Sequence, residues 1–233
     1  MINSYPPATR RQLLSKHCLI STMPEGALDD LVKFTTVARF EPHRVIFSKG
    51  DAGDCLYGIL SGRVRIYSNS AEGAEVMLDV MEGGELFGEI ALLDGNTRTA
   101  SAVAMEQADL LSIHRAHLLT YVKANLDLIL AMLTLVCQRL RWTSSVIEDA
   151  AFLTFPARLA KRLLLLAEHY RRPHDRDVTV PLSQHDLGSM VGTSRETINK
   201  QLALWRSAGI VDTRRGAIVI RNCEALRALI GCV

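Results

Sequence analysis

The stretch from Leu118 to Ala151 contains neither glycine nor proline, and this absence constrains the fold more than any other feature of the chain. A segment of that length without a helix breaker favours one long helix, interrupted at most near Asn125, whose side chain can cap a new helical start. Along this helix, mostly apolar residues recur in alternating steps of four and three, which is typical of a coiled-coil seam. The seam consists of Ile129, Leu133, Val136, Leu140, Thr143, Ile147 and Ala150.

A single amphipathic helix more often packs on its own chain than on a second copy. Here, however, apolar residues also lie off the seam, at Leu128, Leu130, Met132 and Leu135. The helix therefore has more than one face to bury. A homodimer seam combined with packing inside the chain explains both sets, and we predict a homodimer.

The segments before and after this helix have different patterns. From about Ala38 to Ile113, short apolar runs are separated by glycine, aspartate and asparagine, which predicts an antiparallel barrel or sandwich. After Phe155-Pro156 we expect a helix over Ala157–Tyr170 and a short strand over Val178–Leu182. Two helices separated at Gly192 and a β-hairpin follow, which together make a winged helix-turn-helix.

Charge is divided unevenly between these parts. Residues 1–150 hold 14 Lys and Arg against 18 Asp and Glu, whereas residues 151–233 hold 13 against 7. The formal net charge of +2 is therefore the sum of an acidic part at −4 and a basic part at +6. A basic part with a helix-turn-helix pattern favours contact with nucleic acid.

The 5 cysteines are scattered and form no CxxC pair, so we expect neither a disulfide framework nor a metal site. The N-terminal residues show no apolar run of signal-peptide length, and Leu126–Cys137 is too short to span a bilayer. These features predict a cytoplasmic protein without a membrane segment.

The segment from Phe87 to Ser101 carries the groups that a small anionic ligand needs. A glycine before a helical turn leaves backbone N–H groups free for a phosphate, Arg98 supplies a charged fork, and Thr99 supplies a hydroxyl. Glu89 would repel a phosphate but accepts well from a sugar hydroxyl, so the combination indicates a nucleotide. The same residues are also compatible with an ordinary surface turn closed by a salt bridge.

The string FGEIALLDGNTRTASAVA closely resembles the phosphate-binding cassette of cyclic-nucleotide-binding domains. From about residue 25 to residue 220, the order of parts is similar to the cyclic-AMP receptor branch of the bacterial Crp/Fnr regulators. The resemblance implies an α+β fold. A double-stranded β-helix (jelly-roll) sensor domain would occupy residues 1–124, a dimerisation helix and hinge 125–154, and a winged helix-turn-helix domain 155–233.

The resemblance also implies roles for residues of the cassette. Glu89 would hold the ribose 2′-hydroxyl, and Arg98 with Thr99 would hold the cyclic phosphate. The floor and end of the cassette would be formed by Gly88, Ile90, Ala91 and Ala100. Threonine at position 99 is also met in cyclic-GMP sites, so the resemblance favours cAMP and leaves cGMP open.

Three further ligand contacts are implied on the long helix. Thr143 and Ser144 fall where the family has a Thr-Ser pair that reaches the purine, one from each subunit, and Arg139 would flank the ring. A threonine in a coiled-coil seam can also serve only to fix the register of the two helices.

Other branches of the family bind an iron–sulfur cluster or haem. The scattered cysteines speak against the cluster, and His114 with His117 leaves haem as a weak alternative.

The segment Ser194 to Lys200 resembles the family's recognition helix. Residues 195, 196, 199 and 200 would project to one side of it, while Ile198, Leu202 and Trp205 would pack inward. Arg195 and Lys200 suit guanine and Glu196 suits cytosine, whereas a solvated helix face is the plainer interpretation. The full predicted DNA-contact set comprises Ser183, Gln184, His185, Ser194, Arg195, Glu196, Thr197, Asn199, Lys200 and Arg215.

These features together predict a homodimeric, sequence-specific transcription regulator under allosteric control by a cyclic nucleotide. Its DNA site would be a near-palindrome with TGTGA-like half-sites, and RNA polymerase would be a further partner. Three alternatives remain: a regulator of the same fold with another effector or none, an enzyme, and a nucleotide-binding adaptor that does not touch DNA. No nucleophile and base stand at supportive spacing, and the basic part disfavours the adaptor.

Overall fold

The computed structural model describes residues 5–15, 25–70, 72–73, 75–173 and 176–231. The chain divides into two compact units, one formed by residues 1–73 and 77–141 and the other by residues 74–76 and 142–233. The predicted domain boundaries at 125 and 155 stay a prediction.

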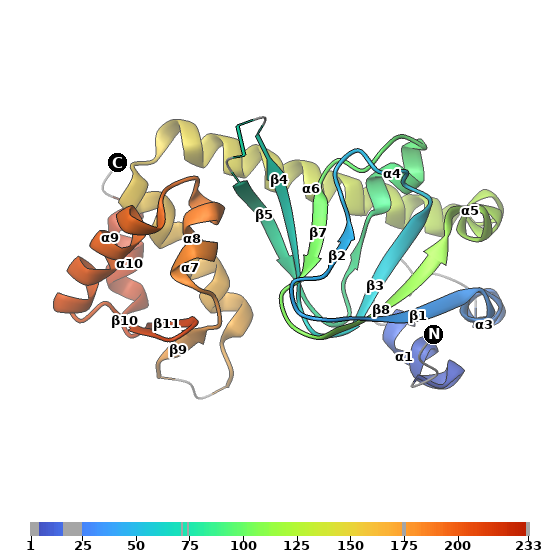
Figure 1. The fold of residues 1–233 in the computed structure, drawn as a ribbon, viewed down its shortest axis with the longest axis horizontal. Coiled ribbons are helices and arrows are strands. Elements are labelled where there is room, and N and C mark those ends of the chain that lie inside the picture. The colour runs from blue at the N-terminus through green and yellow to red at the C-terminus, as the bar shows by residue number, and fades with distance from the viewer. Residues whose placement is uncertain (1–4, 16–24, 71, 74, 174–175, 232–233) are drawn as a thin grey trace. The chain divides into compact units, whose positions relative to one another are not determined.

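The first unit is built on two four-stranded antiparallel sheets, with strand orders β1-β8-β3-β6 and β2-β7-β4-β5 (Figure 1). This arrangement confirms the predicted jelly-roll. The strands are β1 (Thr35–Phe40), β2 (Val45–Phe47), β3 (Cys55–Ser61), β4 (Val64–Asn69), β5 (Glu75–Met81), β6 (Leu86–Phe87), β7 (Ser101–Ala104) and β8 (Ala108–His114).

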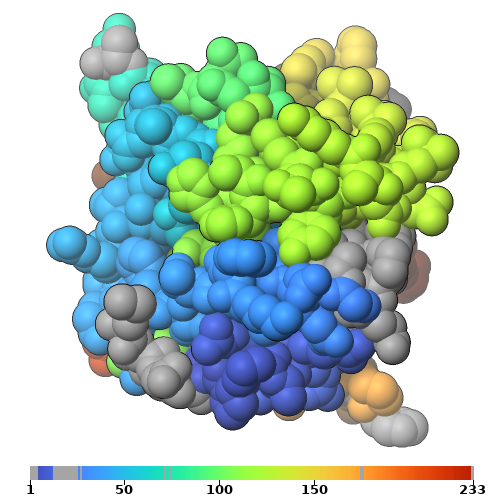
Figure 2. Space-filling view, turned by 90° about the vertical axis from the view of Figure 1, so that its right-hand side faces the viewer, coloured from blue at the N-terminus to red at the C-terminus, as the bar shows by residue number. Residues whose placement is uncertain are grey.

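The core of this unit has two parts. One buried cluster, which includes Ile59, Val64 and Ala102, joins strands of the two sheets. A second buried cluster joins Leu56, Leu111 and Ile113 of the first sheet to helices on its outside. Figure 2 shows α1 (Pro7–Ser15, dark blue), α3 (Glu25–Lys33, blue) and α5 (Arg115–Ala124, yellow-green) side by side on one face of the unit. The short helix α4 (Glu89–Asp94) follows β6 directly. The cassette therefore lies between β6 of the first sheet and β7 of the second.

The predicted long helix is present and is broken where the sequence indicates. α5 ends at Ala124, α6 runs from Leu126 to Phe152, and the two are bent by 116°. At the break, the Asn125 side-chain oxygen accepts from the N–H of Asp127 (3.0 Å) and of Leu128 (3.2 Å). These bonds satisfy donors that a new helical start leaves open.

The two faces of α6 differ as expected except at Leu130, which lies off the seam but is 52% exposed. Leu128, Met132 and Leu135 are buried within the chain. The seam residues Leu133 and Leu140 are 56% and 65% exposed. Within the part of the chain that the structure describes, no single helix is long and apolar enough to cross a bilayer, although α5 and α6 pass that test as a bent pair.

The second unit holds a helix-turn-helix followed by a hairpin. After α7 (Phe155–Tyr170) come β9 (Val178–Val180), α8 (Gln184–Val191), α9 (Arg195–Ser207), the hairpin β10 (Val211–Arg214) and β11 (Ala217–Ile220), and α10 (Cys223–Ile230). β9 pairs with β11, which makes the wing three-stranded. The predicted strand over 178–182 ends early because Pro181 has no N–H to donate to a ladder.

Two glycines shape the close approach of helices α8 and α9. A Cβ at Gly188 of α8 would lie 2.8 Å from the Thr193 carbonyl oxygen in the turn before α9. Gly192 ends α8 in the left-handed conformation (φ 69°), which favours glycine. The backbone between α8 and α9 therefore depends on these two residues.

Candidate functional site

The cassette places an arginine against a glycine turn. Gly88 has φ 84° and leads directly into α4. The Arg98 guanidinium donates from Nη1 to the Gly88 carbonyl (2.9 Å) and from Nη2 to the Cys55 carbonyl (2.6 Å). A Cβ at Gly88 would lie 2.5 Å from Arg98 Nη1, so another residue there would displace the guanidinium as well as strain the backbone at this positive φ.

Arg98 is buried although it carries a charge, with 3% of its surface exposed. Its guanidinium lies 4.3 Å from the ring centre of Phe47 and 5.7 Å from that of Tyr57. Among the described residues, no carboxylate pairs with it, and its buried Nε has no hydrogen-bond partner. A buried cation with an open donor is the arrangement expected of a binding site for an anion.

Glu89 is the second buried charge, with 5% of its surface exposed. Arg139 of α6 lies 3.4 Å from it, measured from Nε to Oε1, and also donates from Nη1 to Asp79 of β5 (3.1 Å). Arg139 therefore holds the Glu89 carboxylate in place and offsets its charge. The predicted contact of Arg139 with a ligand ring stays a prediction.

The rest of the cassette differs in exposure. Ala91 and Ala100 are buried, while Ile90 and Thr99 present surface to solvent. Sequence reasoning missed Gly53, at which a Cβ would lie 2.1 Å from Ala91 Cβ. It also missed the aromatic neighbours Phe47 and Tyr57, because nothing in a strand pattern indicates which ring will face an arginine.

Burial changes the acid–base behaviour of two side chains near Arg98. Burial raises the pKa of the Cys55 thiol, and the neighbouring Asp54 raises it further. Burial likewise raises the pKa of Tyr57, with a smaller contribution from Cys55. Both groups therefore stay protonated and neutral near pH 7.

Thr143 and Ser144 lie on α6 in the second unit, and both are exposed. They share the helix with Arg139, roughly one turn further along. Their predicted contact with a purine stays a prediction.

Serine side chains cap the N-termini of helices α8 and α9. Ser183 forms a capping box with Asp186 at the start of α8, accepting from its N–H at 3.1 Å. Ser194 accepts from the Thr197 N–H at 3.2 Å at the start of α9. These bonds fix where each helix begins and thus where its first turn points.

The recognition helix α9 exposes Arg195, Glu196 and Lys200 and buries its packing face. The buried residues are those expected, namely Ile198, Leu202 and Trp205. His185 on α8 and Arg215 at the tip of the hairpin are also exposed. The exposed set therefore comes from α8, α9 and the wing.

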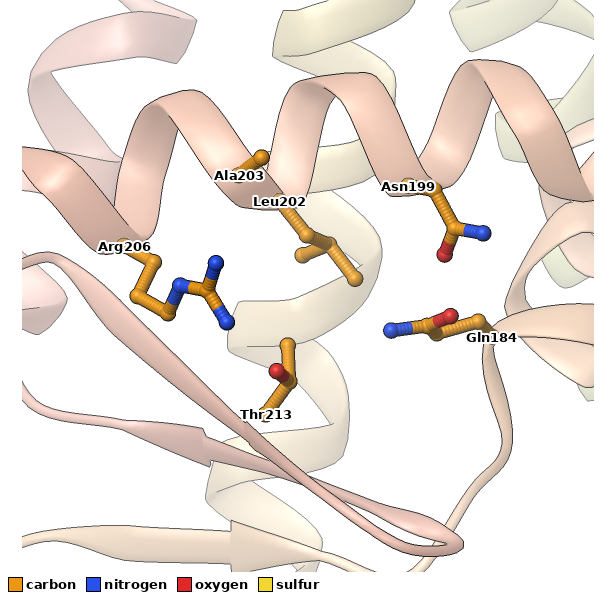
Figure 3. A pocket seen from close by; sticks show the side chains of 6 residues that line it. All are labelled: Gln184, Asn199, Leu202, Ala203, Arg206 and Thr213. Carbon is orange, nitrogen blue, oxygen red and sulfur yellow. The ribbon is translucent and has the colours of Figure 1, made fainter.

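Asn199 departs from this pattern because its side-chain oxygen is buried, and that oxygen has no partner among the described residues. It faces a cavity of about 300 Å³ between α9, the start of α8 and β10. Figure 3 shows the side chains of Asn199 and Gln184 turned toward one another across it. The cavity is lined by Gln184, Asn199, Leu202, Ala203, Arg206 and Thr213.

One unit thus offers a polar site with a buried cation, and the other offers an exposed basic helix with a wing. Together they define a DNA-binding regulator that carries a ligand-binding sensor. Residues 37–125 match the family model of the cyclic nucleotide-binding domain, and residues 157–229 match that of the Crp-like helix-turn-helix domain.

Relatives cover nearly the whole chain. It is 30% identical over 217 residues to the CRP-like cAMP-activated global transcriptional regulator of Mycobacterium tuberculosis, covering 92% of this chain and 97% of that protein. It is 34% identical over 185 residues to the cyclic AMP receptor protein of Thermus thermophilus, covering 79% and 83%. The structure of FixK2 from Bradyrhizobium japonicum shares the fold, with a TM-score of 0.75 at 20% identity, covering 84% of this chain and 96% of that one.

The chain belongs to the Crp/Fnr family of bacterial transcription regulators. Its members bind DNA through the helix-turn-helix and are not enzymes, which confirms both expectations from the sequence.

Proposed function

We propose that this regulator acts as a homodimer whose affinity for DNA is set by cAMP bound in the cassette around Arg98. Glu89 would accept from the ribose 2′-hydroxyl, and Arg98 with Thr99 would hold the cyclic phosphate above Gly88, Ile90, Ala91 and Ala100. Thr143 and Ser144 would reach the purine, and cGMP is the competing ligand.

The observation that carries this proposal is the open Nε of Arg98. A buried guanidinium without a carboxylate partner is costly, and a phosphate would supply the missing charge and acceptors. The Nη groups now donate to carbonyls of Gly88 and Cys55, and these neutral acceptors are weaker partners than a phosphate oxygen. The names of the relatives in Mycobacterium tuberculosis and Thermus thermophilus support cAMP as the ligand.

Calorimetry with cAMP and with cGMP tests this assignment. Arg98→Leu should abolish binding of the preferred nucleotide. Arg44→Leu, which removes an exposed arginine of the same unit, should leave it unchanged. Equal affinity in wild type and Arg98→Leu, or no binding of either nucleotide by wild type, would overturn the proposal.

The dimer would form through the exposed seam of α6. Leu133 and Leu130 offer a matched pair, because they are 56% and 52% exposed on the same helix but only Leu133 lies on the seam. Leu133→Glu should yield monomers in analytical ultracentrifugation, whereas Leu130→Glu should remain dimeric. Dimers of both variants at the wild-type dissociation constant would contradict the seam.

On DNA, the predicted contact residues of α8, α9 and the wing would read TGTGA-like half-sites of a near-palindrome. Arg195, Glu196 and Lys200 would contact base edges, and the remaining residues would contact phosphates. Bound cAMP would favour the arrangement of the dimer in which both recognition helices fit one face of the duplex. RNA polymerase is the further partner, and chromosomal DNA as target implies a cytoplasmic location.

A footprint of the cAMP-bound protein on a palindromic TGTGA site, compared with a scrambled site, tests the half-site. Protection of the palindrome alone is expected. Equal protection of both sequences would contradict the proposed half-site.

A further inference from the structure

Three side chains that the nucleotide site does not use come together at one end of the first sheet. Asp54 precedes β3, Cys55 begins it, and His114 ends β8. One ligand atom from each lies within 4.8 Å of the other two. His114 Nε2 is 3.6 Å from the nearer Asp54 carboxylate oxygen.

The backbone holds this cluster in place before any ligand arrives. Cys55 and His114 are direct partners across the antiparallel strands β3 and β8. Side chains of such a pair start from Cβ atoms only about 4.5–5.5 Å apart on the same face of the sheet. The Asp54 carbonyl accepts from the Arg115 N–H at 2.7 Å, so the residues that precede Cys55 and follow His114 are also joined.

We propose that Asp54, Cys55 and His114 form a binding site for Zn²⁺. A thiolate, an imidazole and a carboxylate are all established zinc ligands, and the thiolate excludes hard cations such as Mg²⁺. One thiolate and one carboxylate would balance the charge of the ion. Three protein ligands leave the fourth tetrahedral position for water on the exposed side.

The imidazole must change one contact to bind the ion. His114 Nδ1 now accepts from the Ala116 N–H at 3.4 Å, which is a long hydrogen bond. With Zn²⁺ on Nε2, the ring proton moves to Nδ1 and this acceptance is lost. The ion would also require the Cys55 thiol to release its proton.

The site touches the cassette through a single peptide group. The Cys55 carbonyl accepts from Arg98 Nη2 at 2.6 Å, so a shift of Cys55 toward a metal alters an acceptor of the proposed phosphate ligand. Zn²⁺ should therefore change cAMP affinity. This consequence rests on the proposed function, whereas the metal site itself does not.

Cobalt spectroscopy on the full-length, reduced and metal-stripped protein tests the site. Wild type should bind one equivalent of Co²⁺ and show a thiolate-to-cobalt charge-transfer band, which Zn²⁺ then abolishes. Cys55→Ala should lose the band. Cys137→Ala, which removes an exposed cysteine of α6, should keep it.

A second variant distinguishes the loss of a metal ligand from misfolding of Cys55→Ala. His114→Gln should keep the circular dichroism spectrum and weaken Co²⁺ binding by more than about tenfold. Absence of the band in wild type, its survival in Cys55→Ala or its loss in Cys137→Ala would each overturn the proposal.

Calorimetry with cAMP, in the presence and absence of Zn²⁺, then measures the coupling. A changed cAMP dissociation constant in wild type but not in His114→Gln is expected. Identical constants would overturn the coupling. Failure of cAMP to bind at all would overturn the proposed nucleotide site while the cobalt result stands by itself.

Discussion

Arg98 and Arg195 are both predicted to meet phosphate or base, yet the molecule holds them in opposite ways. Arg98 has 3% of its surface exposed and is fixed by two carbonyls and two aromatic rings. Arg195 stands exposed on the first turn of α9. The proposed ligand site of the first unit therefore uses contacts that also hold that unit together, whereas the proposed base contact of the second unit comes from an exposed side chain.

The largest effect on stability is expected where the cassette backbone is tightest. Gly53→Ala puts a Cβ 2.1 Å from Ala91 Cβ and should cost about 1–3 kcal/mol in the free energy of unfolding. Gly26→Ala is the matched control, since nothing lies within 4 Å of its added Cβ. Urea titrations measure both. Equal urea midpoints for the two variants would contradict the idea that the proposed ligand site and the fold of the first unit depend on the same contacts.

A somewhat smaller effect is expected at Asp109, which anchors β8 through a bidentate pair with Arg39 and a bond from Tyr5. Arg39 holds the pKa of Asp109 below its usual range, so the ionised form stabilises the fold. Asp109→Asn should cost about 1–2 kcal/mol near pH 7.

The sign of the pH dependence follows from this lowered pKa. The contribution is present above the ordinary carboxyl pKa of about 4 and is lost as the pH falls through the lower folded-state value. The stability gap between wild type and Asp109→Asn should therefore narrow in acid. Thermal unfolding across pH measures it, and a gap that stays constant down to about pH 2 would contradict the assigned pKa.

The smallest effect on stability is expected at Arg195. Arg195→Ala should change the free energy of unfolding by less than about 0.5 kcal/mol, because the side chain is exposed. Discrimination between matched and mismatched half-sites should nevertheless fall by about 1–3 kcal/mol. Competition binding on the two DNAs measures this loss. A large loss of stability, or unchanged discrimination between the two DNAs, would contradict the difference drawn between the surroundings of Arg98 and those of Arg195.

The parts of the fold that depend on near neighbours could be predicted from the sequence. The break at Asn125 and the caps at Ser183 and Ser194 each depend on residues within one helical turn, and all three are where the sequence indicates. The spacing of apolar runs and turns predicted an antiparallel barrel or sandwich and a winged helix-turn-helix, and the resemblance to the Crp/Fnr family narrowed the former to a jelly-roll.

Contacts between distant segments could not be predicted. The pairing of Arg139 with Glu89 requires knowing which face of α6 packs on the sheet. The meeting of Cys55 and His114 depends on the register of β3 and β8, which no local pattern shows. Asn199 lies on the outward side of an isolated helix, and only the approach of α8 and β10 buries its oxygen.

The break at Asn125 and the two faces of α6 also restrict insertions and deletions in this helix. One residue inserted after Gln138 would rotate everything beyond it by about 100° relative to the buried Leu128 and Met132. Thr143 and Ile147 would then leave the seam. An insertion of seven residues would return them to within about 20°. Viable length variants of this helix should therefore differ by whole heptads.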